Sequence, residues 1–166
     1  MPKDDLKNKK TEVVRCLTYA RVSTEEQTHG DYSSVDNQQR ITRSQVECRE
    51  DLGWELVHEV TDPGRSGSSL DRPGIREIIH MIRAEEIDLI IVLRIDRLTR
   101  SIKDFYELWD VMKDHKVDLL SCTENIDTSS PLGKAVLNII LTFAEFEREM
   151  TAARVREKQV EEVKEG

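Results

Sequence analysis

Polar residues that could do chemistry follow three apolar runs of this sequence. The stretch CLTYARVSTEEQ, residues 16–27, closes the first run, residues 61–74 follow the second, and RIDRLTR, residues 94–100, closes the third. Ligands of α/β proteins bind beyond the carboxyl ends of parallel strands, so these segments predict one shared site. The candidate residues are Tyr19, Arg21, Ser23, Gln27, Arg65, Ser66, Arg72, Asp96, Arg97 and Arg100.

The chemistry that this set suggests is attack of a serine on a phosphate group. A guanidinium group is always charged and matches two phosphate oxygens, so several of them can stabilise a phosphate whose negative charge grows. Ser23 would be the nucleophile, activated by this positive field, since the nearest histidine in the chain is His29 in an expected loop. A structural interpretation stays open, because single serines often cap helices and single arginines often lie on the surface. Residues 96–101 could equally form a helix N-terminal turn capped by Thr99 or Ser101.

Other kinds of site find no support in the sequence. The glycine-rich phosphate loop and the dinucleotide-binding glycine motif are both missing, so a nucleotide site is not indicated. The four histidines are scattered, and Cys16, Cys48 and Cys122 lack the spacing of a zinc site or a disulfide framework. We expect no metal and no cofactor, and we expect the three cysteines to be buried free thiols.

Apolar strands alternate with helical segments along the chain. The expected strands are 13–20, 54–60, 88–94 and 117–122, and the expected helices are roughly 35–51, 73–84 and 102–115. The run DLIIVLR, residues 88–94, is apolar on both faces, which suits a buried parallel strand. The alternation predicts an α/β fold with a mostly parallel central sheet and helices on both faces.

Length and charge limit the possible functions. At 166 residues the chain suits one domain with its own hydrophobic core. It has 33 acidic and 25 basic residues, a formal net charge of −8. This is the wrong sign for a whole DNA-binding protein, so nucleic acid would have to meet a local basic patch. The charged first residues do not resemble a signal peptide, and no apolar run approaches membrane-spanning length, so we expect a soluble cytoplasmic protein without membrane association.

We expect a charged N-terminal extension, residues 1–12, and then a catalytic core, residues 13–130. A long helix is expected to follow over residues 131–163. Apolar residues recur in it at steps of three and four, the pattern of helix pairing, which predicts a dimer interface. Its interface residues are Leu132, Val136, Ile139, Phe143, Phe146 and Met150. A long core helix with a solvated tail is the alternative, but the part that extends beyond the domain needs a partner to hold it.

Four ordered motifs resemble those of the serine site-specific recombinases, the resolvase and invertase family. YARVSTEEQ, residues 19–27, is similar to the family's nucleophile motif. SGSSLDRPG, residues 66–74, LRIDRLTR, residues 93–100, and FERE, residues 146–149, with Arg154 beyond it, agree in order and spacing. The resemblance covers about residues 13–158, nearly the whole chain.

The resemblance implies cleavage and rejoining of double-stranded DNA at recombination sites, without metal or cofactor. Ser23 would form a 5′-phosphoseryl link, and a dimer would become a synaptic tetramer for strand exchange. The implied phosphate-binding residues are Arg21, Arg72, Arg97 and Arg100, with Gln27 and Ser66 in support and Tyr19 positioning its neighbours. Asp96 would handle the proton of the leaving 3′-oxygen or orient the arginines. The implied DNA contacts are Arg65, Arg148 and Arg154.

The sequence also departs from the family pattern. The interval 27–38 is longer than in small resolvases and is similar to that of large serine integrases and transposases, so the large type is expected. The family's DNA-binding region does not follow the long helix, so we expect an excised catalytic domain. A non-cutting assembly module is the alternative function. A receiver-like signalling domain is disfavoured, because Arg21 and Ser23 stand where it would need an acidic cluster.

Overall fold

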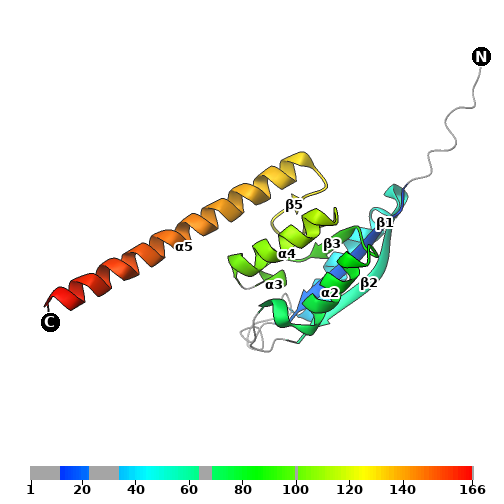
Figure 1. The fold of residues 1–166 in the computed structure, drawn as a ribbon. Helices are drawn as coiled ribbons and strands as arrows, with labels where there is room; N and C mark the ends of the chain where they lie inside the picture. Colours follow the sequence, from blue (N-terminus) through cyan, green and yellow to red (C-terminus); the bar gives the residue numbers. More distant parts are fainter. Residues whose placement is uncertain (1–11, 23–33, 64–68, 100, 166) are drawn as a thin grey trace, which may run out of the picture.

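The computed structural model describes residues 12–22, 34–63, 69–99 and 101–165, with side chains up to residue 156. A five-stranded sheet has the order β2-β1-β3-β4-β5 (Figure 1). Its strands are β1 (Val14–Arg21), β2 (Trp54–Asp62), β3 (Leu89–Val92), β4 (Asp118–Ser121) and β5 (Ile126–Asp127). The first four are parallel, and the two-residue β5, which the sequence did not predict, runs antiparallel to β4.

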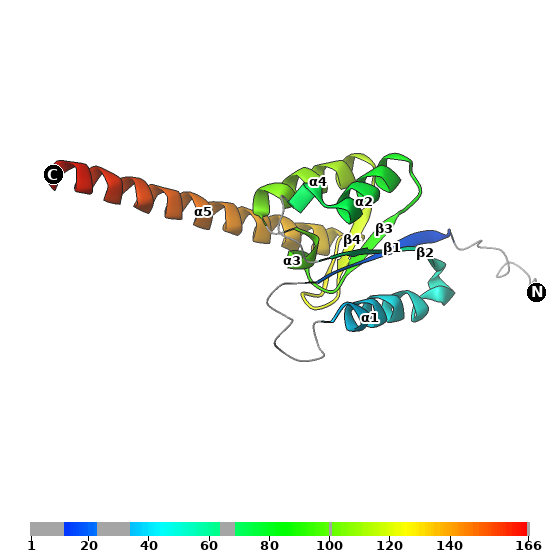
Figure 2. The same cartoon turned by 90° about the horizontal axis from the view of Figure 1, so that it is seen from below.

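Helices cover both faces of this sheet, which confirms the predicted fold class. They are α1 (Val35–Glu47), α2 (Pro73–Arg83), α3 (Ile95–Leu98), α4 (Ile102–Asp114) and α5 (Pro131–Glu165), with 3-10 turns η3 (Glu50–Leu52) and η4 (Ser69–Asp71). Figure 2 shows α1 on one face and α2 with α4 on the other. Pro73 occupies the first turn of α2 as predicted, where its missing N–H removes no helical bond.

The helix predicted over 35–51 is shorter than expected. It ends at Glu47, and η3 follows before Gly53 turns the chain into β2 with φ 86°. Gly53 is the C-cap of η3, and glycine takes this left-handed conformation without steric strain. Cys48 is the C-cap of α1 and is exposed, and Cys122 is only partly buried, so of the three cysteines predicted to be buried only Cys16 is fully so.

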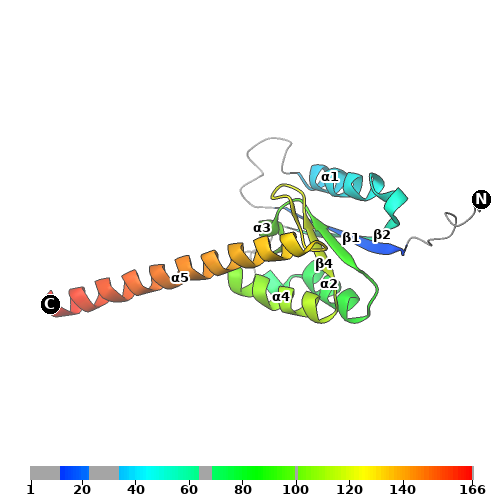
Figure 3. The same cartoon turned by 90° about the horizontal axis from the view of Figure 1, so that it is seen from above.

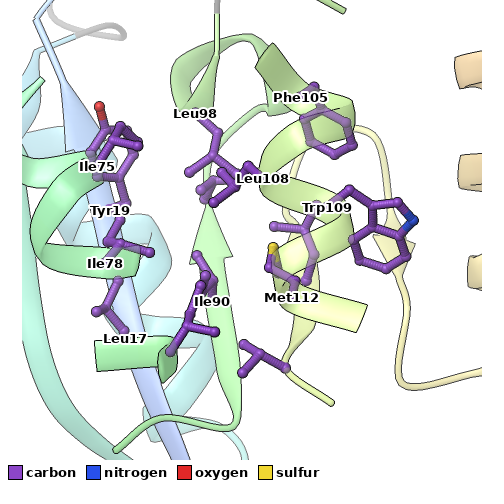
Figure 4. Packing of buried hydrophobic residues seen from close by; sticks show 14 of the residues in the cluster. Leu17, Tyr19, Ile75, Ile78, Ile90, Leu98, Phe105, Leu108, Trp109 and Met112 are labelled. Carbon is purple, nitrogen blue, oxygen red and sulfur yellow. The ribbon is translucent and has the colours of Figure 1, made fainter. Parts of the chain in front are cut away.

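The larger core lies between the sheet and the α2–α4 layer. Leu17 and Tyr19 of β1 and Ile90 of β3 face it, because alternate strand residues point to the same side. They meet apolar side chains of α2 and α4 (Figure 4), among them Ile75, Ile78, Phe105, Leu108 and Met112. Full burial of each such side chain contributes about 1.5–3 kcal/mol, so this layer holds the strand ends rigidly.

A smaller core lies under α1, on the opposite face of the sheet. It consists of Cys16, Val46, Leu89, Ile91 and Leu120. Burial raises the pKa of the Cys16 thiol to about 11, so this cysteine behaves as a small apolar residue. The sheet lies between these two cores. The carboxyl ends of its parallel strands form one edge, where the candidate site lies.

The long helix α5 begins beside β5 (Figure 1) and extends far from the sheet (Figure 3). Its 35 residues span about 50 Å at 1.5 Å per residue. Leu137 and Leu141 are buried in the main core, whereas Leu132 and Phe143 are 74% and 67% exposed. Gly133 is required at the start, because a Cβ there would lie 1.7 Å from the carbonyl oxygen of Asp127. Among the described helices, none is both long enough and apolar enough to cross a membrane.

Candidate active site

The carboxyl ends of the parallel strands bring distant segments to one edge. Arg21 ends β1 and Asp62 ends β2, and the N–H of Val22 donates to the carbonyl of Asp62 at 3.2 Å. The helix α3 follows β3 after two residues and carries Arg97 to the same edge. Arg72 precedes α2 as its N-cap. The structure thus places three predicted arginines together, and all three are more than nine-tenths buried.

Arg21 is held by the backbone of α3. Its Nε donates to the carbonyl oxygen of Arg97 at 3.0 Å and its Nη2 to that of Asp96 at 3.0 Å. Its own backbone N–H and C=O bond to the side-chain amide of Gln38 at 3.2 and 3.0 Å. Gln38 belongs to α1 and is fully buried, so α1 locks the end of β1 from the other side of the sheet.

Arg72 is held by α3 and by a buried phenol. Its Nη2 donates to the carbonyl of Leu98 at 2.6 Å, and its Nη1 donates to the hydroxyl of Tyr19 at 2.8 Å and to the carbonyl of Arg97 at 3.5 Å. The Tyr19 hydroxyl in turn donates to Oδ2 of Asp62 at 2.9 Å. Burial raises the pKa of Tyr19, against the opposing effect of Arg72, so the phenol stays protonated and can accept and donate at once.

Asp62 is a site residue that the sequence reasoning missed. It is 1% exposed, and its Oδ1 accepts the backbone N–H of Gly74 at 2.8 Å. A Cβ on Gly74 would lie 2.8 Å from the Asp62 carboxylate, so glycine is needed for this close approach. A polar residue just past the end of an expected strand, as Asp62 is, was the signal that could have found it. Gln38 had no such signal, because it lies inside a helical segment.

Asp96 contributes its backbone to the site in a way that its residue type did not predict. The carbonyl oxygen accepts from Arg21, whereas the carboxylate is paired with Nε of Arg94 at 3.2 Å and its side chain is 53% exposed. Ser101, one of the two predicted caps, accepts the N–H of Asp104 at 3.1 Å and caps α4, while Thr99 ends α3. This segment therefore forms short helical turns, as the structural interpretation suggested, and it also contributes to the site.

The remaining predicted site residues fall into two groups. Ser23, Gln27, Arg65, Ser66 and Arg100 lie outside the described residues. Arg148 and Arg154 are exposed on the stretch of α5 that follows Ala144, where every described side chain is exposed.

The arrangement suits an anion and offers no metal site in the part of the chain that is described. Among the described residues, the buried charged groups at this edge are three guanidinium groups and one carboxylate, that of Asp62, so positive charge is in excess among them. Rigidly held guanidinium groups of this kind can stabilise phosphate oxygens with little reorganisation. Across residues 12–22, 34–63, 69–99 and 101–156, no group of three or more His, Cys, Asp or Glu side chains could hold a metal ion.

Comparisons with known proteins show which family this chain belongs to. The family model described as "Resolvase, N terminal domain" matches residues 16–166. The DNA-invertase of Escherichia phage P1 is 32% identical over 140 residues, which are 84% of this chain and 66% of that protein. The serine recombinase gin of Escherichia phage Mu is 32% identical over 138 residues, which are 83% of this chain and 62% of that protein. The chain therefore spans no more than 66% of the length of these two relatives.

Solved structures share the fold over most of the chain. The N-terminal catalytic domain of TP901-1 integrase aligns with a TM-score of 0.65 at 37% identity, covering 82% of this chain and 98% of that one. A resolvase family site-specific recombinase from Streptococcus pneumoniae aligns with a TM-score of 0.67 at 23% identity, over 91% of this chain and 99% of that one, which shows the fold alone. Since the family model matches nearly the whole sequence, the chain belongs to the resolvase family, whose N-terminal domain it carries.

Proposed function

We propose that this chain is the catalytic domain of a serine recombinase that cuts and rejoins double-stranded DNA through a 5′-phosphoseryl intermediate. The observation that carries the proposal is the cluster of buried Arg21, Arg72 and Arg97 at the carboxyl edge of the sheet. Ser23 is two residues beyond Arg21 in the chain, so its hydroxyl is the nucleophile that the cluster would serve. The 37% identity to the integrase domain supports the large, integrase-like type.

The proposed step exchanges one phosphate ester for another. The Ser23 oxygen forms a bond to phosphorus, the bond from phosphorus to the 3′-oxygen breaks, and the electron pair leaves with that oxygen. The serine gives up its proton, and the 3′-oxygen takes one to become a hydroxyl. Arg21, Arg72, Arg97 and Arg100 stabilise the charge that grows on the phosphate oxygens. Because the new ester conserves the bond energy, the reverse attack by a 3′-hydroxyl rejoins DNA without ATP.

The supporting groups have distinct proposed roles. Gln27 and Ser66 would support the site, and Tyr19 positions Arg72 through the bond described above. Asp96 is the candidate proton donor to the 3′-oxygen, since its carboxylate is half-exposed at the same edge. Its carbonyl bond to Arg21 supports the orienting role as well.

DNA and further copies of this chain are the proposed partners. Arg65, Arg148 and Arg154 would contact DNA, which lets a chain of net charge −8 meet a polyanion through local basic groups. Self-association would use α5, where Leu132, Ile139, Phe143 and Phe146 are each more than half exposed, with Val136 and Met150 exposed beside them. A row of this kind is typical of an interface, and we propose a dimer that becomes a synaptic tetramer.

The same exposed row favours a second candidate function, a non-cutting assembly module. The two candidates differ in what Ser23 does. Substitution of this serine abolishes chemistry and leaves association intact if the chain is an enzyme. If the chain is a non-cutting module, there is no cleavage to lose, and the substitution leaves association unchanged.

A covalent-adduct assay tests the proposal. The full chain is fused to a DNA-binding domain of known specificity and given a nicked site that traps cleavage. Denaturing gels should show protein attached to the DNA 5′ end for the parent fusion and for Ser129→Ala, a matched loss of an exposed hydroxyl. Ser23→Ala should give no adduct. An adduct that survives in Ser23→Ala, or no adduct from a fusion that binds its site and self-associates, would refute the proposed chemistry.

A further inference from the structure

The short helix α3 supports two of the buried arginines. Arg21 donates to the carbonyls of Asp96 and Arg97, and Arg72 donates to that of Leu98. These acceptors are consecutive residues of a helix that is only 4 residues long. Whatever fixes α3 therefore fixes the direction of both guanidinium groups.

The N-terminus of α3 is held by a carboxylate from a distant part of the chain. The N-cap residue, Arg94, makes no side-chain capping bond. Instead, the backbone N–H of Ile95 donates to Oε1 of Glu124 at 3.3 Å. A carboxylate oxygen at this position satisfies an N–H that the helix cannot pair. Such support matters more in a single turn, which has little cooperative stability of its own.

Glu124 is itself fixed to the end of the sheet. Its Oε2 accepts the hydroxyl of Ser121, which is fully buried as the last residue of β4. The next two backbone N–H groups after Ser121 donate to the carbonyls of Val92 and Leu93 at 3.0 and 2.9 Å, so the pairing of the two strands continues to the residue before Glu124. Through its two oxygens, the Glu124 carboxylate therefore links the end of β4 to the start of α3.

We propose that Glu124 is a positioning residue for the phosphate-binding arginines. It holds the start of α3, and α3 presents the carbonyls that aim Arg21 and Arg72. This inference rests on the proposed function for its chemical consequence. Loss of the carboxylate would let the acceptors shift and the guanidinium groups move away from the geometry that the phosphate needs, a misplacement that can lower a rate by about a hundredfold.

The first test compares Glu124→Ala, Glu124→Gln and the control Glu86→Ala in the adduct assay with the nicked site. We expect Glu124→Ala to slow cleavage roughly tenfold to a hundredfold, with site binding by the fused domain unchanged. Gln keeps an acceptor for Ile95 and should restore the rate to within roughly threefold of the parent, since the geometry rather than the charge is needed. Glu86 is an exposed residue of the turn before β3, so its loss should change nothing. Cleavage by Glu124→Ala at the parent rate would overturn the inference.

The second test needs no DNA and separates this inference from the proposed function. Hydrogen exchange of the unfused chain should become roughly tenfold faster over residues 94–99 in Glu124→Ala and stay at the parent rate over β1 and β3, which also shows that the variant is folded. Unchanged exchange over 94–99 would overturn the link between Glu124 and α3. If the parent fusion itself forms no adduct, the proposed function fails, and hydrogen exchange still decides whether Glu124 holds α3.

Discussion

Removal of the Tyr19 hydroxyl tests the link between Asp62 and Arg72. Tyr19→Phe deletes two charge-assisted hydrogen bonds, of 2.9 Å to Asp62 and 2.8 Å from Arg72, in a fully buried place. Each such bond contributes about 1.5–3 kcal/mol, and the phenyl ring is easier to bury than the phenol. We therefore expect the free energy of unfolding to fall by about 2–4 kcal/mol. At this chain length that lowers Tm by about 5–15 °C.

The same change should weaken catalysis without removing it. Arg72 keeps its bond to the carbonyl of Leu98 at 2.6 Å, so its guanidinium stays near the site but is less well oriented. Adduct formation by the fusion should slow by roughly tenfold to a hundredfold at a temperature where the variant is folded.

The pH dependence of the unfolding free energy gives an independent test of the role of the Tyr19 hydroxyl. Burial raises the folded-state pKa of Tyr19 above its unfolded value near 10, which is an ordinary phenol value. Its contribution is therefore fully present below about pH 10 and is lost as the pH rises through the folded pKa. The difference in unfolding free energy between the parent and Tyr19→Phe should shrink above that pH.

Chemical denaturation monitored by circular dichroism measures these differences, with Tyr106→Phe as the matched control. Tyr106 lies on α4 and is only partly buried, so its hydroxyl should contribute less than about 1 kcal/mol. A loss below about 1 kcal/mol in Tyr19→Phe, or a loss equal to that of Tyr106→Phe, would refute the reasoning that the buried hydroxyl joins Asp62 to Arg72.

Three further perturbations test the helix junction, the long helix and the thiols. Gly133→Ala should lower stability by about 2 kcal/mol or more, seen in thermal melts, because its Cβ would lie 1.7 Å from the carbonyl of Asp127; an unchanged Tm would contradict this steric argument. Phe143→Glu should shift the chain towards monomer in analytical ultracentrifugation with an unchanged circular dichroism spectrum, since the side chain is 67% exposed; if the variant keeps the association state of the parent, Phe143 is not part of the interface. At pH 8 a thiol reagent should label exposed Cys48 quickly and Cys16 only on unfolding, since burial raises the pKa of Cys16 to about 11; equal labelling rates would disprove it.

Much of the fold could be predicted because it follows local patterns. The apolar run that became β3 and the helical spacing around α2 were found within a few residues of their observed limits. The wrong end of α1 and the missed strand β5 both arose where the local pattern is weak. The prediction carried α1 past Glu47 because the polar residues that follow do not themselves break a helix, and β5 has only 2 residues, too few for a periodicity.

The sequence by itself determined that arginines would gather at one sheet edge, since parallel strands place their carboxyl ends together and Arg21 and Arg97 follow such ends. Only the tertiary structure decided how they are held. Asp62 reaches Tyr19 across 43 residues of chain, and the carbonyl of Asp96 reaches Arg21 across 75. Bonds between residues so far apart depend on strand register and helix placement. No local pattern encodes them, so the roles of Asp62, and of Asp96 through its backbone, became visible only when the chain was folded.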